Sequence, residues 1–299
     1  MSHSIELQKA LQELEKTTGI LLSVDEGQDE SQVLHQIKSL TGAYKEKYNK
    51  IHFLKSLLIG DMPISEAGHR AAKFYIPVDE SRYLLLIEMN HKEQEIVMEI
   101  LKNIFPSRSK IFLIPVSEQH IAILHPTKRI GDVTDLEKMC RLIIQSLGAE
   151  AYVYVRVSYS ERLEHLNQLA DAFRKCALAI HVGKLFYTER TVLSYHTLGI
   201  GRLIYELPKQ VCEDFLYEIY GEELPGLEDE ESLNVVAQFI RNNLNIAETA
   251  RQLHMHRNTL IYRLEQIEKR TGLDLRIFED AMTYHVASMV LSYLRHKGS

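Results

Sequence analysis

The hydrophobic positions of residues 1–60 follow a helical rhythm on either side of a short apolar run, ILLSV at residues 20–24. The second helix is predicted to start near Ser31, with a seam of positions at alternating spacings of four and three. The seam comprises Val33, Ile37, Leu40, Tyr44, Lys47, Ile51, Leu54 and Leu58. This is a heptad pattern, broken by Lys47 and weakened by Gly42. Two interpretations stay open: a dimerisation helix, or an amphipathic helix packed on its own chain.

The periodicity changes after residue 60, where strands begin to alternate with helices. Ser65 is the candidate cap of a helix that follows a turn. Strands are predicted over residues 83–89 and 151–157, and a hairpin over 111–126. Helices are predicted around residues 96–104, 136–147 and 161–180. This order indicates an α/β domain in the middle of the chain.

Residues 245–272, NIAETARQLHMHRNTLIYRLEQIEKRTG, predict two short helices joined by a tight connection. Asn245 can cap the first helix, with Glu248 placed as in a capping box. The second helix is predicted from Arg257 to about Thr271, with a buried stripe of Leu260, Leu264 and Ile267. Because Ala250 is small enough to let the two helices cross closely, these spacings indicate a helix-turn-helix.

Charge is distributed unevenly along the chain. The 299 residues carry a formal net charge of −6, yet residues 232–299 hold 9 Lys and Arg against 6 Asp and Glu, a net charge of +3. A mildly basic part is a weak electrostatic sign of a polyanionic partner. It follows an acidic stretch, GEELPGLEDEE at residues 221–231, which interrupts the apolar periodicity and indicates a linker.

The face of the second helix opposite its buried stripe carries groups that read base edges and hold phosphates. The candidate DNA-binding residues are His256, Arg257, Asn258, Thr259, Tyr262, Arg263 and Gln266. Glu265 and Glu268 lie in the C-terminal half of this helix, which leaves its N-terminal half cationic or neutral. The plainer interpretation is a solvated face on an ordinary helical hairpin. His254 favours it, because this residue stands at the turn position usually given to glycine and would need an uncommon backbone conformation.

The stretch HRNTLIYRLEQIE within these helices closely resembles the signature of PucR/CdaR-type regulators, the purine-catabolism and sugar-diacid family. A histidine at this turn is common in that family, which weakens the objection from His254. The family carries a degenerate GGDEF-like domain before its DNA-binding domain, so the resemblance covers residues 65 to 295. Residues 1–60 lie outside this resemblance.

Two segments of the middle domain are similar to motifs of GGDEF-type nucleotide cyclases. Glu88 and Asn90 stand at the two acidic positions of that family's first strand, and Ser117, Glu118, Gln119, His120 and Ile121 stand at its signature. Phosphoryl chemistry needs carboxylates to hold divalent ions and a glycine turn that lets phosphate approach the backbone. Gln119 is not an anionic metal ligand, and Ser117 and Glu118 add bulk and negative charge. We therefore expect no cyclase activity.

The predicted fold class is an α+β multidomain chain. It comprises a helical N-terminal region at residues 1–64 that could serve dimerisation, a degenerate GGDEF-like α/β domain at 65–221, an acidic linker at 222–231 and an all-α helix-turn-helix DNA-binding domain at 232–299. Cys140, Cys176 and Cys212 are far apart and are expected to be buried hydrophobes. His285 is expected to be a partly buried structural histidine.

The expected function is that of a sequence-specific DNA-binding transcriptional regulator, not an enzyme, with double-stranded DNA as its partner. A single helix-turn-helix reads only a few base pairs, so a homo-oligomer, a dimer or higher, on a pseudo-palindromic operator is expected. No cofactor or metal is expected, and an unknown small-molecule effector stays open. The chain has no apolar run near the roughly 20 residues that cross a bilayer, and no signal peptide, so a cytoplasmic location without a membrane partner is expected.

Two other classes of function compete with this interpretation. One is a protein-interaction module that uses the helix-turn-helix fold without binding DNA, and the other is a nucleotide-binding or cyclase-like enzyme. Salt dependence separates DNA from protein binding, because phosphate contacts release counterions.

Overall fold

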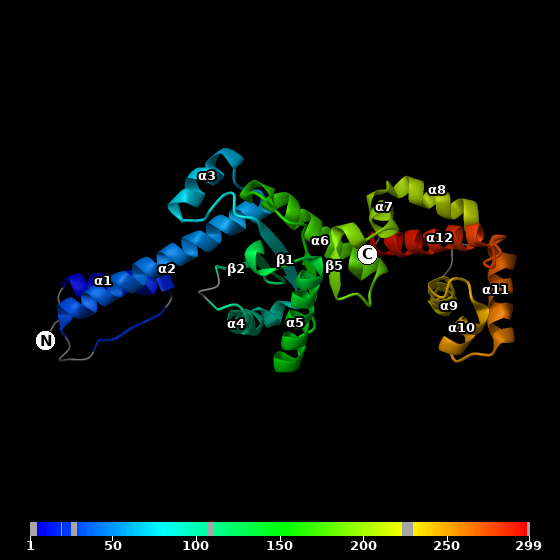
Figure 1. Ribbon diagram of the computed structural model, residues 1–299, viewed down its shortest axis with the longest axis horizontal. Helices are drawn as coiled ribbons and strands as arrows, with labels where there is room; N and C mark the ends of the chain where they lie inside the picture. The colour runs from blue at the N-terminus through cyan, green and yellow to red at the C-terminus, as the bar shows by residue number, and fades with distance from the viewer. Residues whose placement is uncertain (1–4, 19, 25–28, 107–109, 223–229, 298–299) are drawn as a thin grey trace. The chain divides into compact units, whose positions relative to one another are not determined.

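A computed structural model describes residues 5–18, 20–24, 29–106, 110–222 and 230–297. The chain divides into two compact units (Figure 1). The first comprises residues 1–180 and 191–195, and the second comprises residues 181–190 and 196–299. The domain boundaries expected from the sequence remain predictions, and most of the expected acidic linker, residues 223–229, lies outside the described residues.

Two helices form the N-terminal part of the first unit, α1 (Ile5–Thr18) and α2 (Glu30–Ile59). Asp29 caps α2 by accepting a hydrogen bond from the Ser31 backbone N–H at 3.1 Å, and Gly60 ends the helix with a φ of 80°. The two helices pack through a small core of Leu7, Ala10, Leu14 and Ile37. The predicted seam is only partly buried, because Leu40 is 53% exposed and Tyr44 is 39% exposed. The seam therefore does not run as one covered face within this chain.

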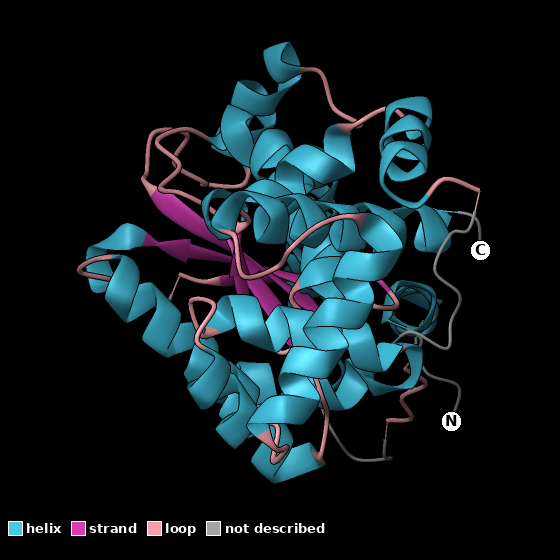
Figure 2. Ribbon diagram, turned by 90° about the vertical axis from the view of Figure 1, so that its right-hand side faces the viewer, coloured by secondary structure: helices cyan, strands magenta, loops and turns pink. Residues whose placement is uncertain are grey.

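The middle of the chain forms a five-stranded sheet in the order β2-β3-β1-β4-β5, drawn in magenta in Figure 2. Its strands are β1 (Arg82–Glu88), β2 (Phe112–Ser117), β3 (His120–Pro126), β4 (Arg156–Tyr159) and β5 (Val192–Ser194). β3 and β4 both pair antiparallel with β1, β2 forms the predicted hairpin with β3, and β5 runs parallel to β4. The sheet is therefore mixed, with three antiparallel pairs and one parallel pair.

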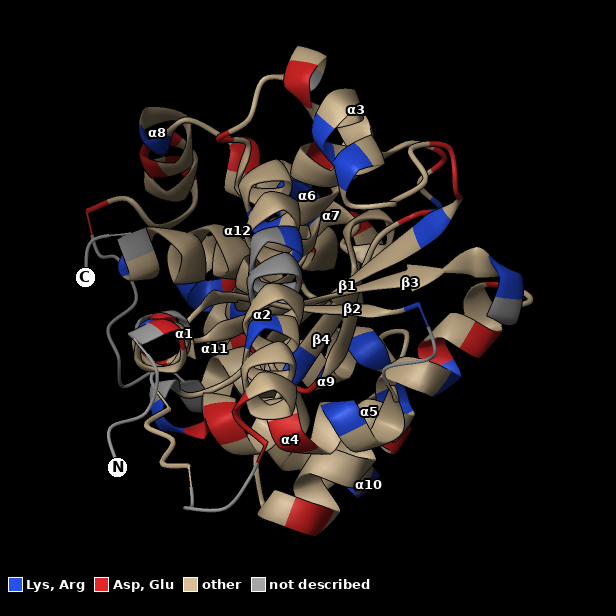
Figure 3. Cartoon of the chain, turned by 90° about the vertical axis from the view of Figure 1, so that its left-hand side faces the viewer, with Lys and Arg blue, Asp and Glu red and all other residues tan. Residues whose placement is uncertain are grey.

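Helix α3 (Ile64–Lys73) precedes the sheet, and the helices that flank the sheet include α4 (Gln94–Ile104), α5 (Val133–Ala151) and α6 (Leu169–Phe186). Alternate residues of β1, such as Leu85 and Ile87, share a core with Leu101 of α4 and Ile143 of α5. On the other side of the sheet, the Ser158 hydroxyl donates to the Cys176 carbonyl of α6 at 2.9 Å. Helix α5 carries both signs of charge (Figure 3), as in the ion pair of Lys138 with Asp135 at 3.1 Å.

The second unit is helical. Its elements after α6 are α7 (Ile200–Glu206), α8 (Lys209–Tyr220), α9 (Glu230–Arg241), α10 (Ile246–Gln252), α11 (Arg257–Thr271) and α12 (Phe278–Lys297). One core joins them, with Leu216 of α8, Phe239 of α9, Leu264 of α11 and Tyr284 of α12 among its buried residues. The helix-turn-helix therefore packs on α8, α9 and α12 and does not stand alone.

Three sequence predictions about local structure were wrong. The expected strand at residues 151–157 is a strand only from Arg156, because α5 continues to Ala151 and ends with Tyr152 in the left-handed conformation, φ 56°. Ser65 lies inside α3, whose N-cap is Pro63. The helix expected over residues 161–180 begins at Leu169, after a 3-10 turn at Leu166–Gln168. No helix in the described residues is long and apolar enough to cross a membrane.

Candidate nucleic-acid interface

Helix α10 starts where the sequence places its cap. The Asn245 side-chain oxygen accepts a hydrogen bond from the Glu248 backbone N–H at 3.1 Å, which satisfies one of the free donors of the first turn. The Glu248 carboxylate turns away from the expected capping box. It accepts instead from Arg251 and from Gln252, each at 2.6 Å. These hydrogen bonds hold the pKa of Glu248 below its usual range.

The connection between α10 and α11 contains one residue in the left-handed conformation. His254 has a φ of 51°, the left-handed conformation expected at this turn. The Met255 backbone N–H then donates to the Ala250 carbonyl at 3.0 Å, closing the turn. His256 is the N-cap of α11, because its Nδ1 accepts from the Asn258 backbone N–H at 3.3 Å. Its ring is thus fixed at the N-terminal end of α11.

Helix α11 has one buried face and one polar face. Leu260, Leu264 and Ile267 are all less than 5% exposed and lie in the core of the second unit. The helix ends at Gly272, whose φ is 74° and whose N–H donates to the Glu268 carbonyl at 2.7 Å. The packing thereby fixes which side chains of α11 face away from the protein.

The candidate DNA-binding residues gather on that polar face. Arg257, Asn258 and Thr259 are exposed in the first turn, and Tyr262, one turn later, is 61% exposed. Arg263 and Gln266 are half-buried. In the described part of the chain, no acidic residue forms an ion pair with Arg257. The first turn of α11 thus offers a guanidinium, an amide and a hydroxyl to a partner.

Two acidic residues near the C-terminal end of α11, one on the helix and one after it, are engaged by Arg276. This arginine contacts Glu268 at 2.9 Å and Asp274 at 2.6 Å. Its hydrogen bond holds the pKa of Asp274 below the usual range of an aspartate. Because these pairs are largely exposed, they contribute little to stability, but they place the Arg276 guanidinium beside both carboxylates.

A polar network that the sequence did not indicate links α9 to α10. The Asn242 amide donates to Gln252 and to Thr249, each at 3.2 Å, and Gln238 also donates to Gln252. Gln252 in turn donates to Glu248. The spacing of Glu248 and Gln252 shows that they share a helix face, but nothing in the sequence pairs that face with α9.

The residues of the middle domain that stand at the cyclase signature, 117–121, make contacts within their own chain. The Ser117 hydroxyl and the His120 Nδ1 lie 2.9 Å apart, and the His120 Nε2 lies 3.8 Å from the Glu88 carboxylate. Asn90 caps a 3-10 turn in a reciprocal capping box with Glu93. Glu88, Asn90, Ser117 and His120 are therefore engaged by contacts within their own chain.

The described residues include no group of three or more histidine, cysteine or acidic side chains placed to hold a metal ion. All three cysteines are buried and free of disulfides, as expected. Burial raises the pKa of Cys140 and of Cys176 to about 12, so these thiols stay protonated at neutral pH. His285 is half-buried, and desolvation followed by the nearby Arg241 lowers its pKa.

Family comparisons match both domains. The family described as "PucR C-terminal helix-turn-helix domain" matches residues 233–290, which contain α10 and α11. The chain carries a PucR C-terminal helix-turn-helix domain. A GGDEF-like domain matches residues 60–182, which contain α3 to α5, β1 to β4 and most of α6. The resemblance to PucR/CdaR-type regulators and the predicted α+β multidomain fold class are thereby confirmed.

Several curated proteins are similar to parts of this chain. The purine catabolism regulatory protein of Bacillus subtilis is 30% identical over 138 residues, which cover 44% of this chain and 25% of that protein. The carbohydrate diacid regulator of Escherichia coli is 27% identical over 186 residues, 61% of this chain and 48% of that protein. The proline-responsive transcriptional activator PutR of B. subtilis is 27% identical over 152 residues, 49% of this chain and 36% of that protein. The chain thus spans between a quarter and a half of the length of these relatives.

Proposed function

We propose that this chain is a sequence-specific DNA-binding transcriptional regulator, not an enzyme, whose helix α11 enters the major groove. The observation that carries the proposal is the two-sided character of α11: one face is fixed in a core, and the other presents Arg257, Asn258 and Thr259 at its N-terminal end. Recognition helices present this end to base edges. The similarity to three regulators supports the same function.

The roles of the interface residues follow from their positions on α11. Arg257, Asn258 and Thr259 would contact base edges or the nearest phosphates, and Tyr262 and Arg263 would follow one turn later. An arginine can bind guanine through two hydrogen bonds and an asparagine can do so with adenine. His256 would lie beside the backbone as the cap of the helix, and Gln266 would lie at the far end of the contact. The first turn of α11, with one arginine and the backbone N–H groups of a helix N-terminus, is also suited to phosphate.

Specific reading of a genome requires more than one such helix. We infer that the chain acts as a homo-oligomer on a pseudo-palindromic operator, with the N-terminal helices setting the spacing of two copies of α11. The alternating seam of α2 motivates this role, and the exposed Leu40 and Tyr44 leave part of it available to a second copy. Measurement of mass in solution tests it, and a monomer both free and on DNA would contradict it.

The function itself is tested by selection of genomic fragments with the purified full chain. The test variant is Arg257→Ala with Arg263→Ala. The matched control, Arg174→Ala with Lys209→Ala, removes the same charge from exposed positions outside α9 to α12. We expect the wild type and the control to enrich an inverted repeat that the test variant fails to enrich. The assignment would be overturned if the test variant enriched the same repeat, or if none of the three proteins enriched any repeat.

A further inference from the structure

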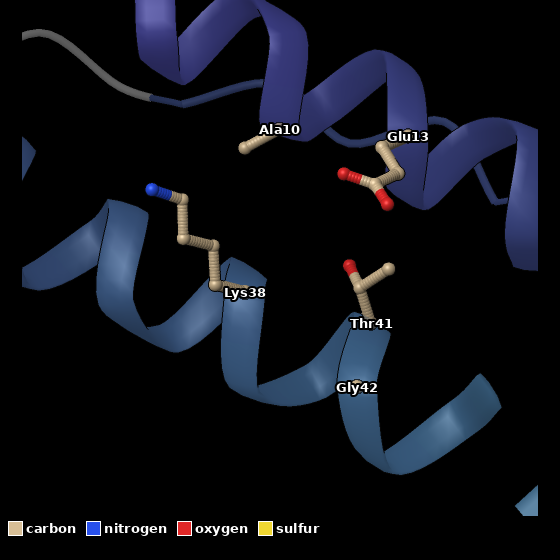
Figure 4. A pocket seen from close by; sticks show the side chains of 5 residues that line it. All are labelled: Ala10, Glu13, Lys38, Thr41 and Gly42. Carbon is tan, nitrogen blue, oxygen red and sulfur yellow. The ribbon is translucent and has the colours of Figure 1, made fainter. Parts of the chain in front are cut away.

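A hollow of about 250 Å³ lies between α1 and α2. Ala10 and Glu13 line it from α1, and Lys38, Thr41 and Gly42 line it from α2 (Figure 4). Sites for drug-sized ligands occupy roughly 300–1,000 Å³, so this hollow suits a smaller molecule. No family match covers it, since the GGDEF-like domain begins at residue 60.

Gly42 keeps one side of the hollow open. No neighbouring atom lies within 4 Å of the place that a Cβ would take at this residue, so close packing of the helices does not require a glycine. Glycine inside a helix is less stable than alanine, and Gly42 lies well inside the 30-residue helix α2. The chain thus retains open space at this position although a side chain would favour the helix.

The polar groups of the hollow point to a ligand that carries both signs of charge. In Figure 4 the Glu13 carboxylate and the Thr41 hydroxyl face each other from opposite helices, and Lys38 extends from α2 toward α1. Thr41 is only 5% exposed, and its hydroxyl donates to the Ile37 carbonyl at 2.7 Å, which leaves its oxygen as an acceptor. Lys38 can hold a carboxylate, while Glu13 and Thr41 can accept from an ammonium group.

We propose that this hollow binds a small zwitterion of the α-amino acid class. Such a ligand would bridge α1 and α2, whose shared core in the described residues is small and includes the buried Leu7, Ala10, Leu14 and Ile37. A molecule that binds the packed pair of helices but not the unfolded chain stabilises the packed state by mass action. This site is separate from α11, so its test does not depend on DNA binding.

The test measures ligand binding to the full chain by thermal shift and calorimetry. The probes are the twenty standard L-amino acids, each tested alone. For every amino acid that binds, the corresponding carboxylate without the amine and the amine without the carboxylate are tested as well. We expect saturable binding of one or a few amino acids, and affinity at least tenfold weaker for each compound that lacks one charge.

Three variants locate the binding. Gly42→Leu fills the hollow with a residue that favours the helix, so the fold is retained and binding is expected to be lost. Lys38→Met is expected to weaken binding at least tenfold. Lys9→Met, an exposed change on α1 that does not line the hollow, is the control and is expected to bind as the wild type does. No binding by any amino acid, or undiminished binding by Gly42→Leu, would overturn the proposal.

Discussion

His254 and Gly272 hold the same left-handed backbone at the two ends of the recognition segment, but only one of them is a glycine. For L-residues this conformation costs roughly 1–2 kcal/mol, whereas glycine adopts it without a steric penalty. His254, with a φ of 51°, therefore bears strain that Gly272, with a φ of 74°, avoids. Strain of this kind persists where the surrounding structure imposes it, and here the turn between two packed helices does so.

Substitutions at Gly272 and His254 should affect the free energy of unfolding differently. Gly272→Ala should lower the free energy of unfolding by about 1 kcal/mol, because alanine is strained at this C-cap. His254→Gly should leave it unchanged or raise it by up to about 1 kcal/mol, since relief of strain is offset in part by the greater freedom of glycine in the unfolded chain. Urea denaturation of both variants measures the difference. Destabilisation by His254→Gly as large as that by Gly272→Ala would contradict the strain argument.

His285 predicts a dependence of stability on pH. Burial and the nearby Arg241 lower its pKa in the folded state below the ordinary value of 6.5. Between these two pKa values the unfolded chain binds more protons than the folded chain, so stability falls as the pH falls below about 6.5. We expect His285→Gln to lose less stability than the wild type between pH 7.5 and pH 5.5, measured by urea denaturation. An equal loss in both proteins would exclude His285 as a cause.

At the scale of elements, the helix-turn-helix was the part of the fold most fully predicted from sequence. Its boundaries are set by explicit chemistry: Asn245 caps α10, and Gly272 ends α11. The strand expected from residue 151 was wrong. The alternation of AYVYV is typical of a strand, but α5 continues to Ala151 and ends at Tyr152 in the left-handed conformation, which a tyrosine does not indicate in a sequence. The three-residue β5 is too short to leave a periodic signal.

The candidate site also has features that the sequence predicts and features that it does not. The polar face of α11 follows from the spacing of Leu260, Leu264 and Ile267, which the sequence shows directly. The link between Asn242 and Gln252 does not, because it joins the turn after α9 to α10 and depends on how these segments pack. His256 was expected as a DNA contact, and its additional role as the N-cap of α11 emerged only with the backbone geometry.

The cap of α10 gives a prediction at this scale. Asn245→Ala removes the acceptor for the Glu248 N–H and should destabilise the protein by about 1 kcal/mol. Asn245→Asp is the matched control, because a carboxylate retains the acceptor and favours the helix N-terminus. Urea denaturation should place the aspartate variant at or above the wild type. A loss in the aspartate variant equal to that in the alanine variant would show that the cap is not the cause.

At the scale of the whole molecule, charge constrains how the proposed function can work. The net charge is −6, while residues 232–299 carry +3. The chain as a whole is therefore repelled by DNA at long range, and attraction must come from short-range contacts of the basic part. Binding should accordingly depend on a few arginines and be sensitive to salt.

The most direct test of the account is the salt dependence of binding to a selected DNA fragment. Dissociation constants for the wild type, Arg257→Ala with Arg263→Ala, and Arg174→Ala with Lys209→Ala would be measured by fluorescence anisotropy over a range of salt concentrations. Each phosphate contact contributes about 0.9 to the slope of log affinity against log salt. We predict that only the α11 variant binds at least tenfold more weakly and with a slope shallower by up to about 1.8. Equal affinity and slope for all three proteins would contradict the assignment of α11 as the DNA-binding helix.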